Sequence, residues 1–376
     1  MSKTYNMATL YFHIPFCKRI CSYCDFYKVG AMEYLPAVVR TMHSELDERA
    51  TYLADRKLTS IYFGGGTPSL LAPEDVEQLI SHARQLFDTS QVAEITLEAN
   101  PDDISEAYAE ALAKTSVDRV SLGVQSFDDR VLRFMNRRHT AREAHEAIGR
   151  LRDRGFRNIS IDIIFGVGGF GSEWLRNTLD EAVATGAEHI SAYHLTVEER
   201  TRLGLMVRRG EYTPIAEEQS EADYALVEQV LQGAGYEHYE VSNYARSGYR
   251  AKHNSAYWRG IEYLGIGPGA HSFSGDDRRW LTSSVRDYAE GRIEFENETL
   301  TTTDHLNEYI MTSLRCVEGI DLDYIATRYG LVEVERIMQA SRGWLQSGVL
   351  QHSGSRLAIP TSKFMLSDAV IESLFT

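Results

Sequence analysis

Apolar and polar residues follow two alternating patterns along the first half of the chain. Short runs rich in β-branched and aromatic residues predict buried strands at residues 9–14, 58–63, 93–98, 119–124, 158–164 and 189–195. Between them, apolar positions recur at the helical period over residues 34–54, 73–87, 104–114, 140–154 and 173–185. Strands that alternate with helices of about 10 or more residues predict right-handed βαβ units and a parallel sheet.

The number of these units bears on the architecture. Six strand–helix units favour an α/β fold with an incomplete (β/α)6 TIM-like barrel over the closed barrel of eight units, and an open sheet with helices on both faces is the alternative. We expect this core to occupy residues 1–235. The pattern after it is less regular, apart from a helix over 216–232, and we assign residues 236–298 to an extension of the core.

A different pattern begins near residue 300. Helical periodicity over 305–315, 322–329, 332–347 and 364–375 surrounds a short hairpin over 349–359. We therefore predict a small, mainly helical, winged-helix-like domain over residues 299–376, which serves packing or partner binding.

Charge and hydropathy narrow the classes of partner and compartment. The chain has 39 basic and 54 acidic residues and a net charge of -15, so it has no general attraction to nucleic acid or to an anionic membrane surface. The N-terminus lacks the apolar core of a signal peptide, and no apolar run approaches the ~20 residues of a membrane span. We expect a cytoplasmic protein without an integral membrane segment or a nucleic-acid partner.

Three of the four cysteines lie in one short stretch directly after the first predicted strand. Cys17, Cys21 and Cys24 are spaced C-x3-C-x2-C. Three thiolates can converge on one metal centre, but they are one ligand too few to close a zinc tetrahedron or a four-iron cluster. The spacing therefore predicts a metal centre with an open coordination position. A structural zinc site completed by a histidine is the alternative.

Polar residues and glycines follow the next predicted strands. Residues 64–66 are three glycines, Glu98 ends the third strand, Gln125 follows the fourth, and Asp162 interrupts the apolar fifth. Because the carboxyl ends of parallel strands meet at one edge of a sheet, we expect these groups to lie near the cysteines and to bind a ligand. Taken singly, each residue is equally consistent with a helix cap or a satisfied core group.

The cysteine motif together with Gly64-Gly-Gly-Thr-Pro68 resembles the radical S-adenosylmethionine (SAM) superfamily. The similarity extends over nearly the whole chain to the HemN/HemW group, and it is carried by residues 13–17, 64–71, 98–101, 123–127, 239–245, 253–258 and 263–272. It implies a [4Fe-4S] cluster held by Cys17, Cys21 and Cys24, whose fourth iron binds SAM. It also implies SAM contacts from Tyr11, Gly65, Gly66, Thr67, Glu98, Gln125, Arg137, Asp162 and Thr196.

Within this group, the resemblance is to HemW-like haem chaperones more than to coproporphyrinogen III dehydrogenases. The dehydrogenases carry a further cysteine where this chain has Phe26, and their longer N-terminal extension is missing, because only ten residues precede Tyr11. Residues 253–258, His-Asn-Ser-Ala-Tyr-Trp, match the HNxxYW motif of the chaperones. This match makes His253 the candidate axial ligand of haem iron, although a hydrogen-bonded core histidine is the plain alternative.

The resemblance thus implies a protein that binds a [4Fe-4S] cluster, SAM and haem and delivers haem to haem-accepting proteins such as respiratory enzymes. We expect a homodimer. The alternative is a radical SAM oxidoreductase that decarboxylates coproporphyrinogen III or modifies haem in another way. No catalytic residue is assigned. One segment departs from the group's pattern, because residues 165–171 have glycine where relatives have proline, which predicts a more flexible loop.

Overall fold

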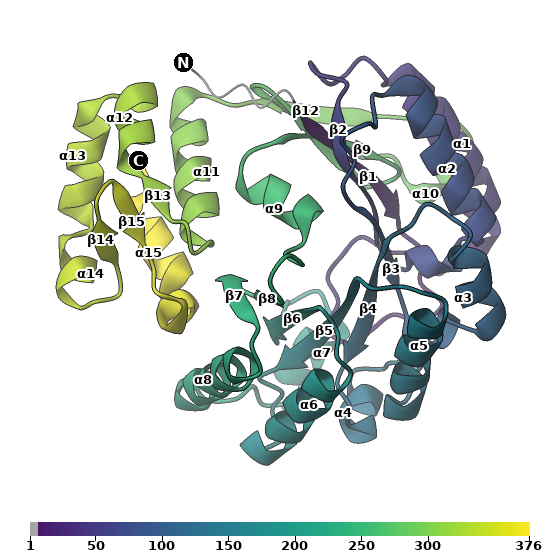
Figure 1. Ribbon diagram of the computed structural model, residues 1–376, viewed down its shortest axis with the longest axis horizontal. Helices are drawn as coiled ribbons and strands as arrows, with labels where there is room; N and C mark the ends of the chain where they lie inside the picture. The colour runs from purple at the N-terminus through teal and green to yellow at the C-terminus, as the bar shows by residue number, and fades with distance from the viewer. Residues whose placement is uncertain (1–6) are drawn as a thin grey trace.

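The computed structural model describes residues 7–376, and a curved, mostly parallel β-sheet forms its centre (Figure 1). The six predicted strands are confirmed in order and are parallel neighbours: β1 (Ala8–Ile14), β2 (Leu58–Gly65), β3 (Ile95–Ala99), β4 (Arg119–Gln125), β5 (Ile159–Phe165) and β6 (His189–His194).

The predicted helices between these strands are also confirmed, and they lie on the outer, convex side of the sheet (Figure 1). They are α1 (Leu35–Glu48), α2 (Pro73–Leu86), α3 (Glu106–Leu112), α5 (Ala141–Asp153), α6 (Ser172–Ala184) and, after β6, α8 (Glu217–Gly233). The sequence pattern did not predict the shorter helices α4 (Asp129–Phe134) and α7 (Arg202–Arg208). No helix in residues 7–376 has the length and apolar character needed to cross a lipid bilayer.

Strand β1 shows why the core lies outside the sheet and the polar groups inside it. Successive side chains of a strand point to opposite faces. Leu10, Phe12 and Ile14 are fully buried in the hydrophobic core, whereas Tyr11 and His13 point to the concave side. The concave side of the sheet is therefore available for polar chemistry.

The sheet is wider than the sequence pattern predicts. Strand β9 (Glu262–Ile266) pairs in parallel with β1, and the antiparallel strands β10 (His271–Ser274), β11 (Asp277–Leu281) and β12 (Phe295–Thr299) extend that edge. The antiparallel strands β8 (Asn243–Ala245) and β7 (Glu237–Glu240) extend the other edge beyond β6. In the described part of the chain β12 and β7 are edge strands, so the predicted incomplete barrel is confirmed and the sheet has twelve strands.

Two further helices belong to this extension. Helix α9 (Lys252–Trp258) lies on the concave side of the sheet, where it packs against β2 (Figure 1). Helix α10 (Val285–Ala289) packs against α1 on the outer side. The 253–258 motif is therefore inside the curve of the sheet.

The mainly helical C-terminal region is confirmed. Its helices are α11 (Thr302–Leu314), α12 (Leu322–Tyr329), α13 (Leu331–Ala340), α14 (Arg342–Gln346) and α15 (Ser367–Leu374). A small antiparallel sheet in the order β13 (Ile320–Asp321), β15 (Arg356–Ala358), β14 (Gln351–Ser353) supplies the wing-like hairpin. The division of the chain at residues 235 and 298 stays a prediction.

Candidate functional site

The cysteines lie on the loop that leaves the carboxyl end of β1. Backbone hydrogen bonds from Cys17 N to Val29 O (3.0 Å) and from Val29 N to Pro15 O (2.7 Å) close the base of this loop. Cys17, Cys21 and Cys24 are partly exposed and line one cavity of about 640 Å³. The three cysteines therefore border the same cavity, and their sharing of one metal centre stays a prediction.

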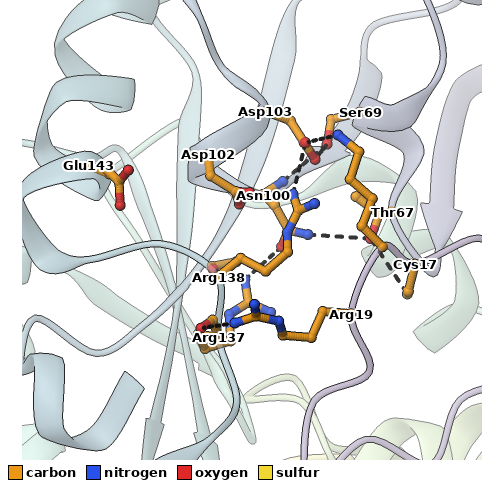
Figure 2. Close-up of polar contacts among 12 residues, drawn as sticks. Cys17, Arg19, Thr67, Ser69, Asn100, Asp102, Asp103, Arg137, Arg138 and Glu143 are labelled. Carbon is orange, nitrogen blue, oxygen red and sulfur yellow. Dashed lines mark hydrogen bonds and ion pairs between the residues drawn. The ribbon is translucent and has the colours of Figure 1, made fainter. Parts of the chain in front are cut away.

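A chain of hydrogen bonds links Cys17 to Cys21 through the ends of three strands, and Figure 2 shows its part from Cys17 to Arg137. Thr67 Oγ1 donates to Cys17 Sγ (3.5 Å) and accepts from Asn100 Nδ2 (3.3 Å). Arg137 donates to Asn100 Oδ1 (2.6 Å) through one nitrogen and to Cys21 Sγ (3.3 Å) through the other. The segments after β2, β3 and β4 thus fix the positions of two metal-ligand candidates.

The surroundings of the sulfur atoms fit an anionic metal centre. Burial raises the pKa of Cys17 and of Cys24, so the free thiols hold their protons, and a bound metal displaces such protons. Arg137 contacts Cys21, and the Lys28 ammonium donates to the carbonyl of Cys24 (2.6 Å), so positive charge lies beside the thiols. Within residues 7–376, no group of three or more Cys, His, Asp or Glu side chains is placed so that it could hold a metal ion as it stands.

Asp103 ties the cysteine loop to the neighbouring strand ends (Figure 2). Its carboxylate accepts hydrogen bonds from Lys18 (3.0 Å), Ser69 (2.9 Å) and Arg138 (2.8 Å), and Arg138 also pairs with Asp102. The side chain of Asp103 is only 4% exposed. This partly buried network connects the cysteine loop, through Lys18, to the segments that follow β2, β3 and β4.

Glu98 lies on the concave side at the end of β3. Its carboxylate accepts hydrogen bonds from the Tyr62 hydroxyl (2.7 Å) and from Gly65 N (3.1 Å). Burial is the main reason that the pKa of Glu98 is raised to about 7, and Asp162 raises it further. A carboxyl group that titrates near neutral pH in such a position is typical of ligand-binding sites.

The glycine turn after β2 is fixed by close contacts. Gly65 has φ +110°, and a Cβ atom there would lie 2.7 Å from the His13 ring. A Cβ on Gly66 would lie 2.7 Å from the carbonyl oxygen of Phe16, which directly precedes the first cysteine. Both positions therefore need glycine, and the turn packs directly against the cysteine loop.

In residues 7–376, only two residues other than glycine have positive φ, and both adjoin this site. Gln125 (φ 69°) ends β4 at an irregularity in its pairing with β5, and Asn136 (φ 58°) donates to the carbonyl oxygen of Ile20 in the cysteine loop (2.8 Å). Such conformations are costly and cluster at functional sites. Near them, burial lowers the pKa of His139 to about 3, and its Nδ1 has no partner among the described residues.

The remaining predicted SAM contacts, Asp162, Tyr11 and Thr196, differ in how close they lie to the site formed by Glu98 and the cysteine loop. Asp162 on β5 is coupled electrostatically to Glu98 and Arg137, and burial raises its pKa to about 6. The Tyr11 hydroxyl is bonded to His13 Nδ1 (3.0 Å), and its ring stacks on Tyr62 at 6.0 Å. Thr196 is exposed, two residues beyond the end of β6.

His253 is a buried member of the concave layer. It is 1% exposed, its Nδ1 is bonded to Ser60 Oγ (2.8 Å), and its Nε2 is bonded to the Tyr257 hydroxyl (3.0 Å). Its ring stacks on Tyr62 at 4.8 Å, and burial lowers its pKa to about 3. In this conformation neither ring nitrogen is open to haem iron, so iron ligation by His253 would require one of these hydrogen bonds to break.

The glycines of the 165–171 loop have a packing role. Val167 is 1% exposed, Gly168 N donates to the Tyr212 hydroxyl (2.8 Å), and a Cβ on Gly168 would lie 2.2 Å from Thr213 O. The first half of the loop is therefore tightly packed, and the greater flexibility of the loop stays a prediction. Residues 169 and 171 are exposed.

The sequence reasoning missed several polar residues of the site. Tyr62, Ser69, Asn100 and Asp103 were not singled out, although the structure places them among the predicted ligand-binding groups. A signal was present, because polar residues occupy alternate positions of the strands, as in Ser60-Ile-Tyr62 and Thr96-Leu-Glu98. In a sheet buried on both faces, such alternation indicates a polar interior.

Comparison with known proteins shows the family of this chain. A family model described as the radical SAM superfamily matches residues 11–182, and one described as the HemN C-terminal domain matches residues 300–362. The heme chaperone HemW of Bacillus subtilis (strain 168) is 33% identical over 335 residues, 86% of this chain and 87% of that protein. The heme chaperone HemW of Mycobacterium tuberculosis (strain H37Rv) is 33% identical over 384 residues, 97% of this chain and 94% of that protein.

Among solved structures, the coproporphyrinogen III oxidase HemN from Escherichia coli, described as a radical SAM enzyme, is similar with a TM-score of 0.83. The likeness covers 98% of this chain and 90% of that chain. The two sequences are 20% identical, so the likeness shows a shared α/β fold.

Proposed function

Because this chain belongs to the HemW family of radical SAM proteins, we propose that it is a haem chaperone that binds a [4Fe-4S] cluster, SAM and haem. The observation that carries the cofactor part is the chain of hydrogen bonds that joins Cys17 to Cys21 through Thr67, Asn100 and Arg137. It puts metal-ligand candidates and polar ligand-binding groups into one connected unit.

The proposed cluster ligands are Cys17, Cys21 and Cys24. When bound, the cluster supplies a one-electron centre and an open iron for the amino and carboxylate groups of SAM. The contribution of the chain is to hold the three thiols on the β1 loop, to neutralise their charge through Arg137 and to fix the loop through the Asp103 network.

The proposed SAM contacts divide by chemistry. Arg137 has a buried Nε without a partner among residues 7–376, which suits the carboxylate of the ligand. Glu98, Asp162 and Gln125 suit its amino and ribose groups, and the Gly65–Gly66 turn leaves backbone groups free to approach it. The other proposed contacts are Tyr11, Thr67 and Thr196.

We further propose that haem is the cargo of this protein and that haem-accepting proteins receive it. The HemW relatives are named as heme chaperones, and their resemblance to this chain covers most of both sequences. Iron ligation by His253 stays a prediction that needs a local opening of α9, and a homodimer stays a prediction.

One paired experiment separates chaperone from enzyme. Anaerobically reconstituted protein is given coproporphyrinogen III, SAM and a reductant, and in parallel it is titrated with haem. We expect stoichiometric haem binding and no protoporphyrinogen. Formation of protoporphyrinogen would reject the chaperone and support the oxidoreductase alternative.

A second measurement tests the cluster. Reconstituted protein should contain about four irons per chain, and the Cys17→Ser, Cys21→Ser, Cys24→Ser variant should contain almost none. Cys316→Ser is the matched control and should keep its iron. A single tightly held zinc in the unaltered protein would instead support the structural zinc site.

A further inference from the structure

Because His253 is buried, the residue that ligates haem iron has to be identified. A histidine ligates iron through the lone pair of a neutral ring nitrogen, and the flat macrocycle needs free space around that nitrogen. His253 has neither, because α9, which carries it, packs against β2 and buries it, and both its nitrogens are hydrogen-bonded.

Most of the twelve histidines in the sequence are likewise buried, hydrogen-bonded or ion-paired. Five are at most 7% exposed, namely His13, His139, His189, His238 and His253. Another five are hydrogen-bonded or ion-paired on the outer surface or at helix edges: His43 with His82, His145 with Glu181, His194 with Ser220, and His305 with Asp276. Within residues 7–376 this leaves His271 and His352 exposed and without a hydrogen bond to the ring.

These two histidines lie in different surroundings. His352 is in β14 of the C-terminal hairpin, whereas His271 begins β10 in the main sheet. The pairing of the strands places His271 opposite Trp280, and their rings stack at 6.0 Å with an interplanar angle of 22°. Within residues 7–376 the imidazole of His271 has this aromatic neighbour and no hydrogen-bond partner.

His271 lies on the concave, polar side of the sheet. Two residues along β10, Phe273 packs on Tyr263, and Tyr263 packs on Tyr257 of α9. His271 is therefore at the open end of an aromatic layer that continues to the 253–258 motif. Aromatic faces of this kind are suited to cover a flat, apolar ring system.

The backbone under His271 is unusually well supported. The next residue, Ser272, is fully buried and accepts hydrogen bonds from Arg49 (2.8 Å) and Gly265 N (2.9 Å). Arg49 forms a buried ion pair with Glu45 (2.8 Å), and Glu45 also accepts from Gly267 N (2.9 Å). A ligand on such a rigid element is held in place before the metal arrives.

The cysteine loop lies beside the same turn. A Cβ on Gly269 would lie 2.9 Å from the Tyr27 ring, and the Tyr27 hydroxyl accepts from Val285 N (3.2 Å). Tyr27 is 43% exposed and its neighbour Phe26 is 72% exposed. Burial also lowers the pKa of His271, which keeps its imidazole neutral at pH 7. An exposed aromatic side chain beside the turn that carries a neutral, unbonded histidine suits the binding of a flat apolar ring system.

We infer that His271 is the axial ligand that this chain offers to haem iron, on an aromatic surface formed by Tyr27, Phe273 and Trp280. The inference rests on the proposed function, because it concerns where the chaperone holds its haem. The bond that forms is a dative bond from a ring nitrogen of His271 to the iron, without a change of oxidation state. His253 then acts as a positioning residue that holds α9 against Tyr62.

The test uses ferric haem and three alanine variants of the full, reconstituted chain. His271→Ala should lose the Soret and electron paramagnetic resonance signature of histidine-ligated haem and bind haem about 10-fold or more weakly. His352→Ala, the matched exposed histidine, should behave as the unaltered protein. His253→Ala should keep the histidine-ligated signature even if its affinity changes.

Two further measurements distinguish loss of the iron ligand from misfolding. Added imidazole should restore the spectrum of His271→Ala, which a merely misfolded variant would not show, and His271→Met should give a different ligand signature. An unchanged spectrum in His271→Ala together with its loss in His253→Ala would overturn the inference and leave the chaperone proposal standing. Failure of the unaltered protein to bind haem would instead overturn the proposed function, and this inference with it.

Discussion

Glu98 gives the sharpest test of the proposed SAM pocket, because its carboxyl group titrates near neutral pH. An ordinary glutamate is ionised above about pH 4.3. Here burial raises the pKa of Glu98 to about 7, so the carboxylate takes up a proton as the pH falls through 7. If the ionised form binds the amino or ribose groups of SAM, affinity for SAM must fall in the same interval.

The size of the effect follows from the pKa. At pH 6 about one carboxyl group in eleven is ionised, so the affinity should be about 10-fold below its value at pH 8, which corresponds to about 1.4 kcal/mol. Glu98→Gln keeps a polar group of the same size but cannot ionise. It should bind SAM more weakly at pH 8 and show a much flatter dependence on pH, with a smaller residual slope from Asp162, whose pKa is raised to about 6.

Equilibrium dialysis of labelled SAM against the reconstituted protein at pH 6, 7 and 8 measures this directly. Glu181→Gln is a suitable control, because Glu181 lies on the outer surface of α6, where its partner is His145. If Glu98→Gln kept the full pH slope of the unaltered protein, Glu98 would not be the titrating group and its proposed contact with SAM would be refuted.

The stability of the free protein provides an independent readout of the same pKa. Since the folded state holds the Glu98 proton more tightly than the unfolded state, stability is favoured at low pH and is lost as the pH rises from about 4.5 to about 7. The loss amounts to at most about 3–4 kcal/mol. Subtracting the urea unfolding curve of Glu98→Gln at each pH isolates this contribution. A difference that does not vary with pH would contradict the raised pKa.

Two further substitutions test the Arg49–Glu45 ion pair and the hydrogen bonds of Arg137. Arg49→Met leaves the fully buried Glu45 without its cationic partner and should lower the free energy of unfolding by about 3 kcal/mol or more in urea denaturation. The double variant Glu45→Leu, Arg49→Met should recover much of this loss, and equal losses in both would contradict the pairing argument. Arg137→Lys keeps the charge but loses the planar fork that reaches Cys21 and Asn100, so SAM affinity should drop about 10-fold while iron content is retained. Unchanged dialysis constants would exclude Arg137 from the SAM contacts.

The sequence alone predicted the parts of this protein that depend on local periodicity. All six parallel strands and the main helices between them follow from runs of apolar residues, because a strand buried under helices needs apolar side chains on its outer face. The spacing of Cys17, Cys21 and Cys24 likewise predicted a shared site, because residues so close in the chain cannot lie far apart. Glu98 and Asp162 were recognisable because a carboxyl group is costly in an apolar strand unless it has partners.

Pairings between segments distant in the sequence were decided only by the tertiary structure. Strand β9 joins the edge of β1 across about 250 residues, and no local pattern of short, mixed segments specifies such a partner. The two candidate ligands of haem iron, His253 and His271, also show that local sequence does not specify long-range packing. A motif drew attention to His253, but packing of α9 against β2 buries it, whereas the antiparallel extension of the sheet leaves His271 exposed beside the cysteine loop. Local sequence specifies which groups are present, and the long-range packing of the chain determines which of them a ligand can reach.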